Sequence, residues 1–477
     1  MLKNDGLLPI RKDLRSVAVI GPAADTVSYG DYTETRGRKG GVSVLDGIRA
    51  AVSPETEVLY ERGCNFLGQA LHPFDPSMLR DENGEAGLTG RYYNGPVPQG
   101  EPVQVRTDRT VNFNWIFALP HPALDANCFS VVWTGSVVMP RTMDGCIGLS
   151  TQDSMRLYVD DKLLIDGWGK DKSADQALDF HFEAGRTYKI RIEFVNDRRG
   201  ARVIFGYSAG RENFPAAVEA ARKADVAILC MGDNEETSGE NFDRTDLNLP
   251  GRQLELVQAV YATGTPVVLV LQSGRPVTAN WENDHLPAIL EAWFPGEQGG
   301  TAIAKTLFGD AAPGGRLPIT FPRSVGQIPC HYSRRPGGGK RYVEMDWLPL
   351  YPFGYGLTYT TFAYRDMALS RSVIDPQDTV TVSVTVTNTG KYTGDAVPQL
   401  YVRDMFSSVV KPERQLAAFR RLTLAPGESR RVELTVGPKQ LRTLGPDYVW
   451  RVEPGKFELQ LGDNAENILL RADLTVE

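Results

Sequence analysis

The chain of 477 residues is mildly acidic, because 52 Lys and Arg residues oppose 59 Asp and Glu residues and leave a net charge of −7. This charge excludes nucleic acid as the main partner, since phosphate binding requires clustered positive charge. Hydrophobic residues make up 42% and charged residues 23% of the chain. That balance is typical of a folded globular protein and excludes disorder as the main state, and the length predicts about three domains.

The sequence also argues against a disulfide framework, a structural zinc site and a membrane span. The five cysteines and five histidines are scattered, and no C-x-x-C motif occurs. We therefore expect neither a disulfide framework nor a structural zinc site. The longest apolar runs, such as 226–231 and 267–271, are far shorter than the about 18 residues that a membrane span needs. Segment 1–13 lacks the uninterrupted apolar stretch of a signal peptide.

Residues 1–85 predict the first part of an α/β domain. The run SVAVIG at 16–21 is short and apolar and is followed by proline, which is typical of a buried strand. Ser43 is a suitable N-cap for a helix over 44–52, and 57–60 favour the next strand.

Residues 86–211 predict strands alone. Aromatic and β-branched residues alternate with polar ones in segments such as FSVVWTGSVVM, TYKIRIEFVND and RVIFGYS. Short strands between turn residues indicate an all-β sandwich, inserted into the α/β domain. Trp115, Trp133 and Trp168 fall here, and we expect them in the core of that sandwich rather than on its surface.

Strand–helix alternation resumes at 212–360. Segment 214–225 is an amphipathic helix, and the apolar runs that follow are typical of buried strands. Strands separated by helices imply a largely parallel sheet covered on both faces. We therefore predict that 1–85 and 212–360 form one α/β sandwich domain.

Residues 361–477 return to strict alternation. Val380, Val382, Val384 and Val386 fall on one face of a strand whose other face is Thr and Ser. This predicts a β-sandwich of immunoglobulin or fibronectin type III kind. The predicted fold class is therefore multidomain: an α/β sandwich domain with an inserted all-β sandwich, followed by an immunoglobulin- or fibronectin-like β-sandwich.

The loop after the strand at 226–231 carries the densest group of chemically useful side chains. Ligands gather at the carboxyl ends of strands in open α/β sheets, so the loop is well placed for function. Within fourteen residues it holds six acids and one arginine: Asp233, Glu235, Glu236, Glu240, Asp243, Asp246 and Arg244. Composition alone leaves two interpretations. One is a solvated loop in which Arg244 pairs with a neighbour, and the other is a carboxylic acid kept protonated by nearby like charge and used as a general acid.

The motif in this loop, SGENFDR followed by LNLPGRQ, resembles the acid/base loop of glycoside hydrolase family 3, the β-glucosidase family. Further segments resemble that family in the same order: VAVIGPAAD at 17–25, LQSGRPV at 271–277, AWFPGEQGGTAIAKTLFGDAAPGGRLPITFP at 292–322 and PLYPFGYGLTYTTF at 349–362. The insert resembles a PA-14 domain, and the last residues resemble the family's fibronectin type III-like domain. The resemblance covers essentially the whole chain.

By its position in the motif, Glu240 corresponds to the family's general acid/base. The sequence departs from the motif at Asn241, where glycine is usual, and a side chain there can alter the conformation of the loop. Asp243 and Arg244 occupy the Asp-Arg of the motif, and we expect them to support the loop by an ion pair rather than to touch sugar. The resemblance implies a retaining hydrolase of β-D-glucosyl or related residues, with two carboxyl groups about 5–5.5 Å apart and no cofactor.

The resemblance also implies a nucleophile outside these residues. Family members carry a (β/α)8 barrel that supplies the nucleophilic aspartate, and no pattern for a barrel of about 250 residues occurs here. We therefore expect this chain to be inactive without a barrel, in cis or in trans. Asp346-Trp347 resembles the family's nucleophile dipeptide, but it lies in the tail of the α/β domain, where we expect no catalytic role. Any secretion signal would precede the barrel, so localisation stays open.

Asp160 and Asp161 are weak candidates for a metal site in the insert. The pair is similar to the aspartates that bind calcium in lectin-type PA-14 domains. A polar hairpin turn, VDDK, accounts for the same residues without an ion, and we expect the turn.

Two alternative functions fit the same sequence. One is a non-catalytic carbohydrate-binding protein in which the PA-14-like insert binds the sugar, and the other is one subunit of a split enzyme. A fragment of a longer enzyme is equally compatible. The expected substrate is a β-linked oligosaccharide or aryl glucoside, and the choice among glucoside, xyloside and N-acetylglucosaminide stays open.

Overall fold

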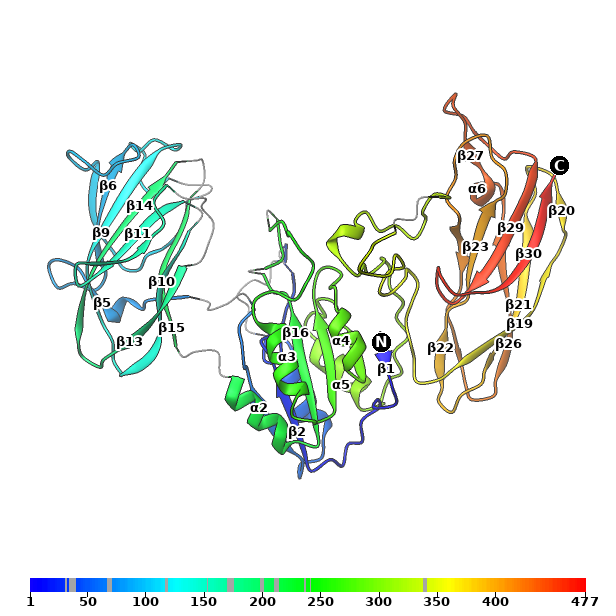
Figure 1. The fold of residues 1–477 in the computed structure, drawn as a ribbon, viewed down its shortest axis with the longest axis horizontal. Coiled ribbons are helices and arrows are strands. Elements are labelled where there is room, and N and C mark those ends of the chain that lie inside the picture. Colours follow the sequence, from blue (N-terminus) through cyan, green and yellow to red (C-terminus); the bar gives the residue numbers. More distant parts are fainter. Residues whose placement is uncertain are drawn as a thin grey trace. The chain divides into compact units, whose positions relative to one another are not determined.

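The computed structural model describes residues 1–30, 32–33, 40–66, 71–115, 119–151, 153–169, 176–197, 201–209, 214–235, 237–240, 242–337 and 341–477 (Figure 1). The chain divides into two compact units. The first contains Met1–Phe66 and Phe214–Glu477, and the second is Leu67–Asn213. The predicted multidomain organisation is confirmed, with mixed sheets followed by a C-terminal β domain. Among the described helices, none is long and apolar enough to cross a membrane.

A six-stranded sheet forms the centre of the first unit, in the order β1-β18-β17-β16-β2-β3. Its strands are β1 (Lys3–Asn4), β2 (Ser16–Ile20), β3 (Glu57–Glu61), β16 (Val226–Gly232), β17 (Val267–Gln272) and β18 (Ala288–Glu291). All pairs are parallel except that of β1 with β18. Every residue of β2, β16 and β17 is buried, which explains why these strands read as continuous apolar runs.

Five helices cover the two faces of this sheet: α1 (Val44–Ala51), α2 (Phe214–Lys223), α3 (Gln253–Tyr261), α4 (Asn280–His285) and α5 (Gly299–Leu307) (Figure 1). Alternate residues of the strands belong to two separate hydrophobic clusters. Ile20, Leu229 and Leu269 pack with α2 and α3. Their neighbours in sequence, Val19, Ile228 and Val268, point to the other face and pack with α1 and α5. The period-2 alternation of strand side chains therefore gives each face its own core.

Local signals at α1 explain its position. Asp46 N–H donates to Ser43 Oγ at 3.1 Å, so the predicted N-cap is confirmed. The helix lies very close to α5, because a Cβ on Gly300 would stand only 1.8 Å from the Ser43 carbonyl oxygen. Only glycine permits this approach.

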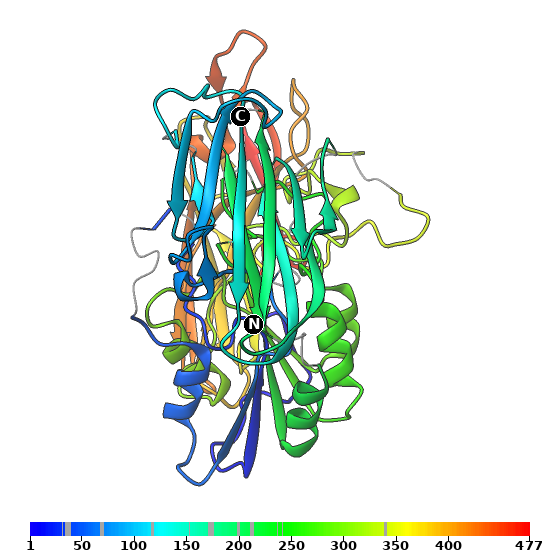
Figure 2. The same cartoon turned by 90° about the vertical axis from the view of Figure 1, so that its left-hand side faces the viewer.

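The second unit holds two antiparallel sheets (Figure 2). One has the order β13-β10-β15-β4, with β8 on β15, and the other has the order β12-β11-β14-β9-β6-β7, with β5 on β9. The elements are β4 (His72–Pro73), the 3-10 turn η1 (Pro76–Met78), β5 (Leu79–Arg80), β6 (Leu88–Asn94), β7 (Gln104–Asp108), β8 (Asn112–Asn114), β9 (Phe129–Val138), β10 (Met143–Thr151), β11 (Ser154–Val159), β12 (Lys162–Asp166), β13 (Gln176–Phe182), β14 (Thr187–Asn196) and β15 (Arg202–Ala209). The unit begins earlier than the predicted boundary at residue 86, because β4 and β5 hydrogen-bond with β15 and β9.

Aromatic side chains fill the core of this unit. Trp115 and Trp133 are buried, as predicted, whereas Trp168 is partly exposed beneath the Arg156 guanidinium. Trp133 Nε1–H donates to the buried Asp108 carboxylate at 2.7 Å, and Tyr92 donates to the same group. These bonds give hydrogen-bond partners to the indole N–H and the phenol hydroxyl, which would otherwise be buried without one.

The C-terminal part of the first unit is a β domain. Its main sheets have the orders β19-β21-β26 and β20-β30-β29-β23-β24. The elements are β19 (Phe362–Leu369), β20 (Val373–Ile374), β21 (Val380–Asn388), β22 (Gly394–Ala396), β23 (Gln399–Asp404), β24 (Gln415–Phe419), β25 (Leu422–Leu424), β26 (Ser429–Val436), α6 (Pro438–Leu441), β27 (Thr443–Leu444), β28 (Trp450–Arg451), β29 (Gly455–Gly462) and β30 (Ile468–Val476), preceded by the 3-10 turn η2 (Val325–Gln327). The four predicted core valines of β21 are all fully buried.

The separate cores predict that the second unit can be removed. Its hydrophobic cluster contains only residues between Phe74 and Phe205, and the other three clusters contain none of these. A chain in which a short flexible linker replaces 67–213 should keep a cooperative unfolding transition, because no core loses atoms. Circular dichroism during a urea titration measures this. Loss of the cooperative transition would show that the second unit is needed for the α/β sheet.

Candidate functional site

The loop after β16 leaves the sheet at its carboxyl edge through a very tight contact. Gly232 has φ +144°, and a Cβ on it would lie 1.8 Å from the Gln272 carbonyl oxygen at the end of β17. The buried Gln253 side chain accepts from Gly232 N–H at 2.7 Å and donates to Gly232 O at 2.8 Å. Gln253, the last residue of the LNLPGRQ segment, therefore fixes the end of β16, where the loop begins.

Asp233, the next residue, is a fully buried carboxylate. Its amide donates to Gln272 O at 2.8 Å, and its Oδ1 accepts from Thr237 Oγ1 at 3.0 Å. Arg275, which follows β17, lies with Nε 3.0 Å from Asp233 Oδ2. Burial lowers the pKa of Arg275 and the Asp233 charge opposes that shift. A buried carboxylate requires such a counter-charge.

Glu240 lies on the exposed side of the loop. The Tyr32 hydroxyl donates a hydrogen bond to it, and this bond is the main reason that the pKa of Tyr32 is raised. Tyr32 comes from the segment between β2 and α1, and its side chain is 79% exposed. Two segments that leave neighbouring parallel strands thus meet at Glu240, as the shared carboxyl edge of β2 and β16 requires.

Arg244 is directed to the base of the loop. Its Nη1 lies 4.0 Å from Asp233 Oδ1 and donates to Thr237 O at 3.4 Å. Asp243 is exposed and forms no ion pair with a residue that the structure describes. The partner of Arg244 in these contacts is therefore Asp233 rather than Asp243. Glu236 and Asn241 lie outside the described residues.

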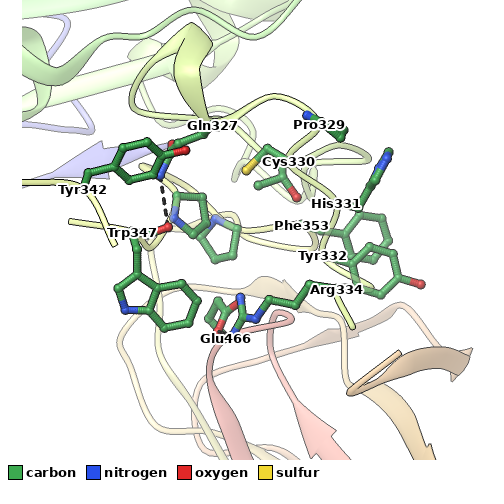
Figure 3. A pocket seen from close by; sticks show the side chains of 13 residues that line it. Gln327, Pro329, Cys330, His331, Tyr332, Arg334, Tyr342, Trp347, Phe353 and Glu466 are labelled. Carbon is green, nitrogen blue, oxygen red and sulfur yellow. Dashed lines mark hydrogen bonds and ion pairs between the residues drawn. The ribbon is translucent and has the colours of Figure 1, made fainter. Parts of the chain in front are cut away.

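The Asp346-Trp347 dipeptide is distant in sequence from the loop that carries Glu240, and its Trp347 borders a separate cleft. Asp346 is exposed and accepts from Leu348 N–H at 3.0 Å. Trp347 borders an open cleft whose lining contains no residue of 233–248 (Figure 3). Arg334 stacks on Trp347 at 4.5 Å and pairs with Glu413 and Glu466 of the β domain, at 3.1 and 2.7 Å. Trp347 thus contributes to the junction with the C-terminal β domain.

Asp160 and Asp161 form a hairpin turn between β11 and β12. Both have positive φ, 50° and 62°, as a tight two-residue hairpin requires. Lys189 Nζ lies 2.8 Å from Asp161, and Lys189 N–H donates to Asp160 at 2.9 Å. In the part of the chain that the structure describes, no group of three or more His, Cys, Asp or Glu residues is arranged to hold a metal ion.

Comparison with known proteins assigns the family. The model of the glycosyl hydrolase family 3 C-terminal domain matches residues 1–359, which include the whole loop from Asp233 to Asn248. This chain belongs to glycosyl hydrolase family 3. A second model, of the fibronectin type III-like domain, matches residues 396–465 and identifies the C-terminal β domain.

Relatives in this family are named as β-glycosidases. A β-xylosidase from Formosa agariphila is 45% identical over 302 residues, which are 61% of this chain and 42% of that protein. A β-glucosidase from Rhizobium radiobacter is 34% identical over the whole chain and 61% of its own length. The β-glucosidase from Kluyveromyces marxianus in complex with glucose has 27% identity and a TM-score of 0.71, over 100% of this chain and 61% of that one. The chain therefore spans about two fifths to three fifths of the length of these relatives.

Two contacts at this loop escape analysis of the sequence. Nothing in the local pattern pairs Asp233 with Arg275, and nothing joins Tyr32 to Glu240. The one available signal is position, since each of these four residues follows the carboxyl end of a predicted strand. Glu291, at the end of β18, shares that signal.

Glu291 is a partly buried residue near the same edge, and its Oε2 atom is buried. Its Oε1 accepts from Trp293 N–H at 2.9 Å, and its Oε2 has no hydrogen-bond partner among the described residues. Burial raises the pKa of Glu291 to about 8, although the hydrogen bond from the Trp293 amide and the positive charge of the Met1 amino group oppose this shift. The group is therefore largely protonated in the folded family 3 domain at neutral pH.

Glu291→Gln should reduce the loss of stability at high pH. Because the folded pKa lies above the ordinary value of 4.5, the unfolded chain releases this proton first. The free energy of unfolding then falls as pH rises from 4.5 towards 8, by up to about 5 kcal/mol. Urea unfolding at pH 5 and pH 8 measures the difference. Equal pH dependence in the variant and the unmodified protein would contradict the assignment.

Proposed function

We propose that this chain forms the acid/base side of a retaining β-glucosidase-type glycoside hydrolase. The observation that carries the proposal is the exposed Glu240, in the family's acid/base motif, on a loop fixed to the carboxyl edge of a parallel sheet. Family membership and relatives named β-glucosidase and β-xylosidase support it. In this proposal the architecture is an α/β sandwich domain, interrupted by a PA-14-like β-sandwich and followed by a fibronectin type III-like domain.

Glu240 acts twice in the proposed reaction. It first donates a proton to the leaving oxygen while an aspartate attacks the anomeric carbon and forms a glycosyl-enzyme. It then takes a proton from the water that hydrolyses this intermediate. The aspartate belongs to a (β/α)8 barrel, in cis or in trans, and no cofactor takes part. Arg244 supports the loop through Asp233 and Thr237, and neither Asp243 nor Arg244 touches sugar.

The proposed substrate is a terminal, non-reducing β-D-glucosyl or closely related residue. The names of the relatives include both a glucosidase and a xylosidase, so the class is a β-linked hexose or pentose. Most contacts with that sugar are assigned to the barrel, and this chain faces the leaving group.

The 477 residues alone should release no nitrophenol from aryl β-glucosides or β-xylosides, because the proposed nucleophile is outside them. Absorbance measured over hours with purified protein tests this. Turnover that disappears in Asp346→Ala would contradict the proposal and assign the nucleophile to Asp346.

Glu240→Ala should slow hydrolysis strongly when the chain is joined to a matching barrel. General acid catalysis contributes about 10²–10⁴-fold, and the loss depends on the leaving group. Dinitrophenolate leaves without a proton, so formation of the glycosyl-enzyme should be nearly unchanged, whereas a methyl or sugar leaving group should react slowest. Azide should then restore turnover of the dinitrophenyl substrate, because it attacks the glycosyl-enzyme without a base.

Glu235→Ala and Glu236→Ala are the matched controls in the same loop. Each should change the pH profile more than the maximal rate. If Glu236→Ala shows the leaving-group dependence and the azide rescue while Glu240→Ala does not, the acid/base is Glu236.

A further inference from the structure

The Asp233–Arg275 ion pair contacts both ends of the loop that carries Glu240. At the first end, Thr237 Oγ1 donates to Asp233 Oδ1, and the same Oγ1 accepts from Asn234 N–H at 3.1 Å. These bonds close a compact turn directly above the carboxylate. The chain therefore enters the loop in a conformation that depends on Asp233.

The second end of the loop is held by Arg275. Its Nη1 donates to Leu247 O at 2.9 Å, and its Nη2 donates to Asn248 O at 3.0 Å. Thr278 adds a bond from its amide to Leu247 O at 3.0 Å and one from its hydroxyl to the Asn248 side chain at 2.6 Å. The guanidinium thus pairs with Asp233 through Nε and Nη2, and its Nη1 and Nη2 also donate to the returning chain.

The contacts of Arg275 with the end of the loop depend on the negative charge of Asp233. Asp233 is 0% exposed and faces Arg275, while Arg244 from inside the loop approaches to 4.0 Å. Neutralising Asp233 leaves two guanidinium groups close together without their counter-charge, and burial already lowers the pKa of Arg275. Arg275 would then turn towards water and release the Leu247 and Asn248 carbonyl groups.

We propose that Asp233 and Arg275 are positioning residues for Glu240, because their ion pair closes the base of the acid/base loop. Glu240 stands seven residues after Asp233 and seven before Leu247, at the middle of the closed segment. Fixing both ends limits the positions that its carboxyl group can reach. Proton transfer requires a defined distance to the leaving oxygen, so a loose loop costs rate at that step. This inference rests on the proposed function of Glu240, although the closure of the loop does not.

The first test uses the chain as it stands and requires no activity. In Asp233→Asn, amide hydrogens of 237–248 should exchange at least about tenfold faster, because closure of the loop contributes to their protection. Asp225→Asn is the matched control, since Asp225 precedes β16, pairs with Arg15 at 2.8 Å and lies at the opposite edge of the sheet. The exchange of 237–248 should be unchanged in that control. Equal exchange in the two variants overturns the proposal.

The second test uses the chain joined to its barrel and compares a methyl β-glucoside with a dinitrophenyl β-glucoside. Asp233→Asn should lower kcat about tenfold or more for the methyl substrate and far less for the dinitrophenyl substrate, with KM little changed. Arg275→Lys keeps the charge but loses the fork that reaches Leu247 and Asn248, so it should show the same dependence at smaller size. A destabilised but correctly positioned enzyme loses both activities equally, and that result overturns the proposal.

The two tests separate this inference from the proposed function. If the unmodified enzyme hydrolyses neither substrate, the proposed function fails, and the positioning of a catalytic Glu240 fails with it. Faster exchange in Asp233→Asn would then still establish that the ion pair closes the loop. If both substrates are hydrolysed and Asp233→Asn shows no leaving-group dependence, the proposed function stands and the positioning role is wrong.

Discussion

A buried charge pair at the edge of a parallel sheet is the constraint on which the site depends. Asp233 is fully buried, and a carboxylate in that position requires a counter-charge, which Arg275 supplies. The two residues can meet because β16 and β17 are parallel neighbours, so the chain leaves both strands at one edge. Nη1 and Nη2 of Arg275 also donate to the carbonyl groups of Leu247 and Asn248, at the far end of the loop that carries Glu240. The same guanidinium group therefore neutralises Asp233 and holds the end of the loop.

The sheet that provides this edge is assembled from two distant stretches of chain. Strand β2 pairs with β16 although the second unit lies between them in sequence. Each stretch contributes one side chain to the contact at Glu240, since Tyr32 follows β2 and Glu240 follows β16. The insertion leaves the hydrophobic clusters on the two faces of the sheet intact, because none of their residues belongs to the second unit. A family 3 domain can thus be interrupted without loss of the edge that holds its loop.

Local signals in the sequence predict those elements in which the spacing of apolar residues matches the residues that are buried in the structure. Continuous apolar runs gave β16 and β17, strict alternation gave the buried face of β21, and Ser43 gave the start of α1. β4 and β5, which precede residue 86, have two residues each, too few to show a period in the sequence. The motif directs attention to Glu240, but the pairing of Asp233 with Arg275 spans 42 residues and is decided by strand order. A local sequence pattern does not show which strands are neighbours in the sheet, so it cannot predict this pairing.

The discontinuous sheet also has a consequence for synthesis on the ribosome. When β2 leaves the exit tunnel, its pairing partner β16 has not been made, and the 147 residues of 67–213 must be translated first. At about 5–20 residues per second, this takes roughly 7–30 s. The second unit carries its whole core within its own residues and has time to fold in that interval. During the same interval β2, which is fully buried in the folded sheet, lacks its partner β16, so the order of translation exposes this strand to aggregation.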